Sequence, residues 1–378
     1  MRSGADERVN VVAQARERAG AAGVSLRDLS DSNPTRHGLF DQAIADLVAQ
    51  AARRAIRYDP DPRGVLRARE ALAARFGGHP GDYWLTAGTS EAYGWLFSLL
   101  TDPGDRVAVP RPGYPLVEPL ARLAGAETAG YPAYYLHPYG WEYDLDAFTG
   151  LLREPRVKAV VAVNPNNPTG AYADAGLADR CAAEGMPLIV DEVFAPFALD
   201  APFSGTLSGR ADSLTFGLDG VSKMLAAPQL KLGWIRLSGP AGEVAKIAPV
   251  LDRIADSYLP VSAPVANALP ELLGLADTIE ARIRERLRDN LETCRKFFGA
   301  APYRVRRTDG GWTVLVDVPR IMDDDALIIA LIERGLYVHP GWFYDLDSTG
   351  TLALSLLPEP NVFTDNCGRL SEALASLG

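Results

Sequence analysis

The distribution of apolar residues along the chain predicts alternating strands and helices over the first two thirds of the sequence. Short apolar runs predict strands at 83–86, 106–109, 159–163, 187–190, 215–218 and 232–237. Helical periodicity or helix-forming composition marks 41–57, 64–77, 90–101 and 115–124. Buried strands separated by helices are typical of βα units, so we expect an α/β protein with a mostly parallel sheet.

The last third of the chain follows a different pattern, which predicts a smaller α+β unit. It begins with one long amphipathic helix over 264–298 and continues with short β runs and two further helices. The chain starts with a polar stretch and a helix within 1–30, which we expect to complete this unit. The predicted division is an N-terminal segment (1–45) that contributes to the small domain and to an active-site loop, a large α/β domain (46–265) and a small C-terminal α+β domain (266–378).

Charge and composition narrow the choice of partners and compartment. The net charge is −10, from 48 acidic and 38 basic residues, which argues against a surface for nucleic acid or anionic membranes. Three cysteines and four scattered histidines show no ligand spacing, so we expect no metal site and a reducing, cytoplasmic compartment. The first residues, MRSGADERVNVV, lack the apolar centre of a signal peptide, and no apolar run reaches the roughly 18 residues that span a bilayer.

Two charged side chains directly follow predicted strands, at the sheet edge where ligands bind in α/β proteins. Lys223 lies in Val221-Ser222-Lys223 before an apolar stretch. A lysine is most often a solvated surface group, but a desolvated lysine becomes a nucleophile toward carbonyls. Asp191 ends a buried strand, where an acid is costly unless it has a partner such as a protonated pyridine nitrogen.

Two polar turns occupy equivalent positions after other strands. Residues 164–170 read Asn-Pro-Asn-Asn-Pro-Thr-Gly, a composition that is also typical of an ordinary turn. Residues 87–90 read Ala-Gly-Thr-Ser and lead into a helix. Free N–H groups and hydroxyls at a helix start suit a phosphate, although an N-capped turn has the same composition.

The order and spacing of these motifs resemble the class I/II aminotransferases, which belong to fold type I of the enzymes that depend on pyridoxal 5'-phosphate (PLP). The blocks NNPTG, DEVF and SK…KLGW carry the resemblance, and matches run from about residue 25 to about residue 357. It implies a large domain with a mostly parallel sheet and a smaller α+β domain. It also implies that PLP is bound as an aldimine on Lys223. Lys223 then transfers protons, and the reaction passes through a quinonoid intermediate.

The resemblance assigns roles to further residues of this sequence. Asp191 would pair with the pyridine nitrogen, Asn167 would donate to the phenolic oxygen, and Tyr114 would stack on the ring. Lys231 stands where the family usually has a phosphate-binding arginine, and the phosphate shell would be completed by Gly88, Thr89, Ser90 and Ser222. Tyr58 would reach the phosphate of a neighbouring subunit, which implies a homodimer with shared active sites.

The sequence departs from the family pattern at two positions. Phe194 replaces a tyrosine that donates to the ring oxygen, and a tyrosine from elsewhere, such as Tyr258, is one candidate to fill that place. Ala353 replaces the arginine that binds the substrate α-carboxylate. Either another arginine does this work, with Arg36 as first choice, or the substrate lacks that contact. A solvated loop cation is an equally good interpretation of Arg36, and His339 is either a specificity residue or a packed structural histidine.

The sequence therefore predicts a PLP-dependent aminotransferase of biosynthesis that acts on a small amine or amino acid. A lyase, cyclase or β/γ-replacement enzyme of specialised-metabolite biosynthesis is the alternative, because the early chemical steps are shared. A non-catalytic PLP-binding regulator is disfavoured, because such proteins carry a fused DNA-binding domain and this chain is acidic without an extension long enough for one.

Overall fold

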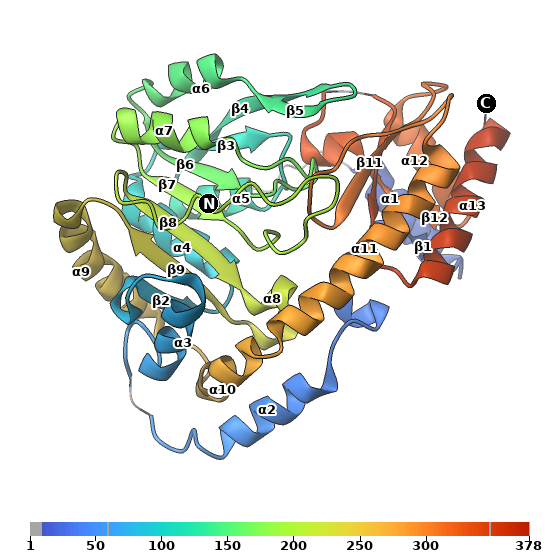
Figure 1. Ribbon diagram of the computed structural model, residues 1–378. Helices are drawn as coiled ribbons and strands as arrows, with labels where there is room; N and C mark the ends of the chain where they lie inside the picture. The colour runs from blue at the N-terminus through green and yellow to red at the C-terminus, as the bar shows by residue number, and fades with distance from the viewer. Residues whose placement is uncertain (1–9, 59, 348, 378) are drawn as a thin grey trace.

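An eight-stranded sheet forms the centre of the molecule (Figure 1). The computed structural model describes residues 10–58, 60–347 and 349–377, so the first nine residues of the stretch predicted over 1–30 lie outside the described residues. Its strands lie in the order β2 (Tyr83–Thr86), β9 (Gly233–Ser238), β8 (Thr215–Gly220), β7 (Leu188–Asp191), β6 (Val157–Val163), β3 (Arg106–Arg111), β4 (Glu127–Leu136) and β5 (Gly140–Tyr143).

The sheet is mostly parallel, as the sequence predicts. Strands β4, β3, β6, β7 and β8 run in one direction, while β9 is antiparallel to both of its neighbours and β5 is antiparallel to β4. Strand β2 therefore runs with the majority. The carboxyl ends of β2, β3, β6, β7 and β8 consequently share one edge of the sheet, and all the predicted polar motifs follow these strands.

Helices cover both faces of the large sheet. Successive residues of a strand point to opposite sides, so the apolar strands present side chains that must be buried on each face. Val107 and Val109 belong to one hydrophobic cluster and Ala108 belongs to another. The first cluster includes residues of α4 (Thr89–Leu100), α5 (Val117–Ala124) and α9 (Ala241–Tyr258). The second includes residues of α6 (Leu145–Leu152) and α7 (Ala175–Ala183).

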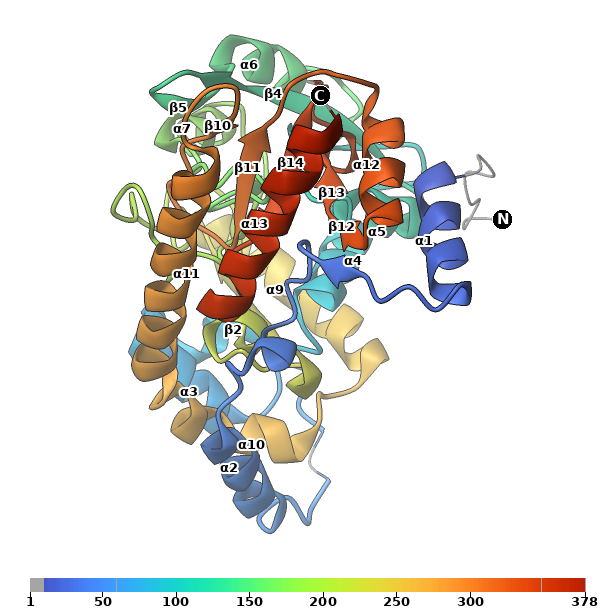
Figure 2. The ribbon, with the colours of Figure 1, turned by 90° about the vertical axis from the view of Figure 1, so that its right-hand side faces the viewer.

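A second, four-stranded antiparallel sheet lies beside the first and is built from the C-terminal third (Figure 2). Its order is β10 (Arg304–Val305), β11 (Thr313–Asp317), β14 (Thr351–Ser355) and β13 (His339–Pro340). The N-terminal segment joins this region, because β1 (Arg27–Asp28) pairs in parallel with β12 (Leu336–Tyr337). The helices of the region are α1 (Val11–Ala21), α11 (Ala276–Phe298), α12 (Asp324–Glu333) and α13 (Pro360–Leu377).

The prediction of a single helix over 264–298 is wrong. The chain forms α10 (Ala263–Leu273) and α11 (Ala276–Phe298), and a tight turn separates them. Gly274 and Leu275 each donate to a carbonyl three residues back, at 3.1 and 3.0 Å, so the regular pattern stops there. Glycine is a weak helix former, which favours a break at this point. The amphipathic pattern of the sequence nevertheless continues across the break. Helix α10 packs against α2 (Gln42–Ala52) and α3 (Leu66–Phe76).

Candidate active site

A cavity of about 680 Å³ lies where the carboxyl edge of the large sheet faces the C-terminal elements. It collects side chains from motifs that are far apart in the sequence. The sequence-predicted residues among its lining are Gly88, Thr89, Ser90, Tyr114, Asn167, Asp191, Ser222, Lys223, Lys231 and His339. Arg36 and Tyr58 are not part of the lining.

Lys223 projects into this cavity from α8 (Val221–Met224), the short helix that directly follows β8 and lies beside α11 (Figure 1). Its Nζ lies 5.0 Å from the ring centroid of Trp312 and 5.6 Å from that of Phe194. Within the described part of the chain, no group forms a hydrogen bond with this amine. Burial lowers the pKa of Lys223, and the charge of Asp191 opposes the shift only in part. The amine is therefore held closer to its neutral, nucleophilic form.

Asp191 is the last residue of β7 and is only 8% exposed. Burial raises the pKa of this carboxyl to about 6, against the lowering effect of two hydrogen bonds and of Lys223. The bonds come from the Val193 amide at 3.2 Å and from the Tyr93 hydroxyl at 3.0 Å. A buried carboxylate that faces a cavity is stabilised by a cationic partner, and a protonated pyridine nitrogen meets that need.

Tyr93 is a part of the site that sequence reasoning missed. It lies in α4 one turn after Thr89, so both side chains lie on the same face of the helix. Its hydroxyl is fully buried on Asp191, and this burial raises the pKa of the phenol well above its usual value. The sequence carried a signal for it. Tyr93 is four residues after Thr89, a predicted phosphate-binding residue, so the two side chains point toward the same site.

The start of α4 has the features of a phosphate site. Gly88 caps the helix with φ +104°, and no side chain caps its first turn. A β-carbon at Gly88 would lie 3.8 Å from Nζ of Lys231, so this lysine is close to the helix start. The hydroxyls of Thr89, Ser90 and Ser222 donate to no other described residue. Free donors at a helix start beside a cation suit a phosphate dianion.

The side chains around the remaining edge of the cavity also fit a flat aromatic cofactor. Asn167 accepts a hydrogen bond from Thr313 at 3.3 Å through Oδ1, and among the described residues its amide nitrogen has no partner. Phe194 packs edge-on against Trp312, with ring centroids 5.6 Å apart. The donor set of amine, carboxylate, amide and hydroxyls therefore fits PLP. Tyr258, which was a candidate to replace the missing phenol, lies instead against Trp95 at 5.5 Å and does not line the cavity.

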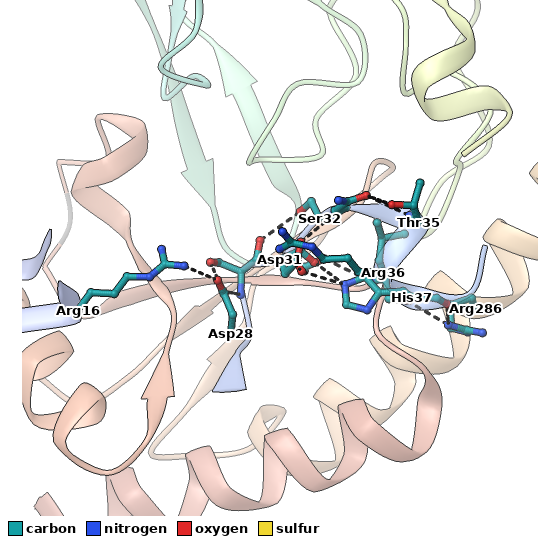
Figure 3. A network of polar contacts seen from close by, with 12 residues as sticks. Arg16, Asp28, Asp31, Ser32, Thr35, Arg36, His37 and Arg286 are labelled. Atoms are coloured by element: carbon teal, nitrogen blue, oxygen red, sulfur yellow. Dashed lines mark hydrogen bonds and ion pairs between the residues drawn. The ribbon is translucent and has the colours of Figure 1, made fainter. Parts of the chain in front are cut away.

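Ala353 is 1% exposed and pairs with Leu315 across the four-stranded sheet. It shares a small hydrophobic cluster with Tyr344 and Leu346, so apolar packing surrounds the position where the family has arginine. Arg36 lies in a network around the N-terminal loop (Figure 3). Its side chain is 70% exposed and forms an ion pair at 3.2 Å with Asp31, which itself lines the cavity.

His339 lies at the opposite wall, within a small aromatic group. Its Nδ1 is 3.0 Å from the Tyr344 hydroxyl, and its ring stacks on Phe343 with centroids 4.3 Å apart. Burial lowers the pKa of this histidine. The aromatic packing of His339 agrees with a structural histidine, and its position in the cavity lining agrees with a specificity residue. Tyr58 is 70% exposed at the surface.

Two absences hold for the described residues. No three histidine, cysteine or acidic side chains gather closely enough to hold a metal ion within 10–58, 60–347 and 349–377. In the same ranges, no helix combines the length and apolar character needed to cross a bilayer.

Comparisons with known proteins agree with this geometry. A family model described as aminotransferase class I and II matches residues 29–362. The alanine aminotransferase of Mycobacterium tuberculosis is 28% identical over 356 residues, covering 89% of this chain and 76% of that protein. An S-alkyl-thiohydroximate lyase of Arabidopsis thaliana is 32% identical over 252 residues, covering 63% of this chain and 53% of the lyase.

The fold is shared with solved structures. The alanine aminotransferase of Pyrococcus furiosus superposes with a TM-score of 0.88 at 21% identity, covering 97% of this chain and 96% of that one. The predictions of the fold and of the cofactor are confirmed. The chain belongs to the class I and II aminotransferases, which are PLP-dependent enzymes.

Proposed function

We propose that this aminotransferase moves an amino group from an amino-acid donor to a 2-oxo acid, with Lys223 as its catalytic base. The observation that carries the proposal is the pair of opposite pKa shifts in one cavity. Burial lowers the pKa of the Lys223 amine and raises that of the Asp191 carboxyl. Strongly perturbed groups that share a cavity mark functional sites.

Each residue has a defined task in this proposal. PLP, when bound, supplies a carbonyl that amines attack and a ring that accepts electrons from the donor's Cα. The neutral amine of Lys223 would attach the cofactor, and when free it would accept the proton from the donor's Cα. Asp191 would hold a proton on the ring nitrogen, and the Tyr93 hydroxyl, which donates to Asp191 at 3.0 Å, keeps that carboxylate in place. Asn167 would donate to the ring oxygen, and Tyr114 would cover one face of the ring.

The phosphate is held in the proposal by the start of α4. Gly88, Thr89, Ser90 and Ser222 supply neutral donors, and Lys231 supplies the positive charge. Lysine keeps the charge of the family's arginine but lacks its two-pronged geometry, so we expect looser retention of the phosphate.

Assembly, domains and location are also proposals. The exposure of Tyr58 outside its own cavity supports a role for it in a neighbouring subunit, and thus a homodimer with shared active sites. The proposed division is 1–45, 46–265 and 266–378, and the pairing of β1 with β12 supports the assignment of the N-terminal segment to the small domain. Three buried free cysteines suit a reducing cytoplasm, which is the proposed location. We also propose that the enzyme acts in a biosynthetic pathway.

Elimination, replacement or cyclisation is the second candidate, and the substitutions at Phe194 and Ala353 favour it. The experiment that separates the two uses the holoenzyme with L-alanine or L-glutamate and no acceptor. Transamination stops after one equivalent of 2-oxo acid per active site and releases no ammonia. Continued turnover with release of ammonia or another leaving group would establish the second candidate instead.

A further inference from the structure

The cavity holds few positive charges, and most of them already have a task. The cationic side chains among its described lining are Lys223, Lys231 and Arg111. Lys223 is the nucleophile, and Lys231 lies beside Gly88 at the phosphate site. Arg111 is the one that remains for a negatively charged group of the substrate.

Arg111 is positioned by the large sheet. It is the last residue of β3, directly before the Pro-Gly-Tyr motif that carries Tyr114. Its side chain lies across Gly130 of β4, where an added β-carbon would come within 2.5 Å of Cγ of Arg111. A glycine at this point of β4 therefore leaves room for the arginine side chain to lie across β4, where it is part of the cavity lining.

One edge of the guanidinium donates to a carboxylate, and the other makes only a long ion pair and no hydrogen bond. Nη1 donates to Asp345, which belongs to the opposite wall of the cavity. Nη2 is 4.0 Å from Glu118, which is beyond hydrogen-bond distance. Across the described ranges, Nε and Nη2 donate to no protein group. An arginine side that presents two parallel N–H groups is the geometry that binds a carboxylate.

Three of the carboxylates that line the cavity have an arginine partner outside the lining. Asp28 is paired with Arg16 at 3.2 Å and Asp31 with Arg36 at 3.2 Å (Figure 3). Glu118 is paired with Arg122 at 2.8 Å. These acids are therefore neutralised by partners that lie outside the lining.

We propose that Arg111 binds the substrate carboxylate through its Nε–Nη2 edge and replaces the arginine that is absent at Ala353. Asp345 is then a positioning residue, which holds Nη1 and orients the open edge. The inference rests on the proposed function and names the side chain that recognises the carboxylate of its amino-acid donor. The carboxylate is bound from the β3 side of the cavity rather than from β14.

The test measures binding of unreactive probes to the holoenzyme by calorimetry. The probes are 3-phenylpropionate and its uncharged isostere 3-phenylpropionamide, with butyrate and butyramide as a smaller pair. The wild-type enzyme should bind each acid at least tenfold more tightly than its amide. Arg111→Gln should lose roughly ten- to hundredfold in affinity for the acids, the range of a charged hydrogen-bonded pair, and little for the amides. Arg111→Lys should be intermediate.

Arg153→Gln is the matched control. Arg153 also pairs with a carboxylate, Glu184 at 2.8 Å, and it lies outside the cavity lining, so its removal should change neither affinity. The inference is overturned if the wild-type enzyme does not prefer the acids, or if Arg111→Gln and Arg111→Lys both keep the preference. Because the probes do not react, these outcomes leave the role of Lys223 to its own test. A holoenzyme that carries the cofactor on Lys223 but fails here loses the inference alone.

Discussion

The two walls of the cavity differ in how they are built. The sheet wall consists of residues at or just past the carboxyl ends of β2, β3, β6, β7 and β8, and it includes Arg111, Asp191 and Lys223. The loop wall consists of residues 28–32 and 339–345, which come from opposite ends of the chain. The Arg111–Asp345 ion pair joins the two walls.

This difference separates two functions. The sheet wall keeps most of the family's motif residues, with departures at Phe194 and Lys231, and its side chains fit the cofactor. The loop wall contains the aromatic group of His339 and Phe343 and lies beside the departure at Ala353. We infer that the sheet wall fixes the cofactor chemistry and that the loop wall, with Arg111, selects the substrate.

The largest expected effect lies on the sheet wall. Asp191→Asn removes the charge that stabilises the protonated ring, and kcat should fall by roughly 10²–10³-fold, as when one preorganised electrostatic partner is lost. Stopped-flow measurement of 2-oxo acid formation in a single turnover checks this. Asp212→Asn makes the same change at an exposed acid that is paired with Arg210, and should leave kcat unchanged. Equal rates for wild type and Asp191→Asn would show that Asp191 of the sheet wall does not contribute to the chemical step.

The same substitution should stabilise the cofactor-free protein in a pH-dependent way. The pKa of Asp191 is about 6 in the folded protein against an ordinary 3.8, so the folded state holds this proton more tightly. Stability is therefore lost as the pH rises from about 4 to about 6, and it stays lower above that range. The loss is on the order of 3 kcal/mol.

Asparagine cannot ionise, so Asp191→Asn should raise the free energy of unfolding above pH 6 and bring no gain near pH 4. Urea denaturation curves at pH 4, 5, 6 and 8 measure this difference. An increase in the free energy of unfolding that is the same at all four pH values would show that ionisation of Asp191 does not destabilise the folded protein.

A smaller effect should follow from the exposed Lys231. Lys231→Gln removes one charge from the phosphate site, and cofactor affinity should weaken by roughly three- to fivefold, as for an exposed ion pair. Lys231→Arg restores the two-pronged geometry and should bind the cofactor at least as tightly as wild type. Equilibrium dialysis gives both Kd values. A loss in Lys231→Arg as large as in Lys231→Gln would contradict a phosphate role.

The smallest effect concerns Arg36, which the sequence favours as the carboxylate partner. Its 70% exposed side chain is bound to Asp31, so Arg36→Gln should change the affinity for 3-phenylpropionate by less than about threefold. A tenfold loss in this variant, with none in Arg111→Gln, would return the carboxylate site to the N-terminal loop.

The sheet wall could be predicted because its residues obey a local rule. Polar residues that directly follow buried strands reach the same edge of a parallel sheet, whatever their distance in sequence. Tyr93 was missed, although it lies one helical turn after a predicted ligand, and Arg111 was missed, although it lies two residues past the strand predicted at 106–109. Both positions follow from the rule when it is applied to every strand and to the helix that comes after it.

The loop wall could not be predicted in the same way. Asp31 and Asp345 are far apart in the sequence, and they line one cavity only because β1 pairs with β12. Such pairing depends on tertiary packing that short apolar runs do not encode. The break between α10 and α11 was missed for a related reason, since the apolar pattern continues while the backbone turns.

The central claim is that Lys223 carries the cofactor, and reduction with borohydride followed by peptide mapping tests it most directly. We expect the added cofactor mass on the peptide that contains Lys223, and none on the peptide that contains Lys231. Lys223→Ala should lose both this mass and the absorbance band that PLP gains when it condenses with a protein amine. A band that persists in Lys223→Ala, or a label on another lysine of the wild-type protein, would contradict the account.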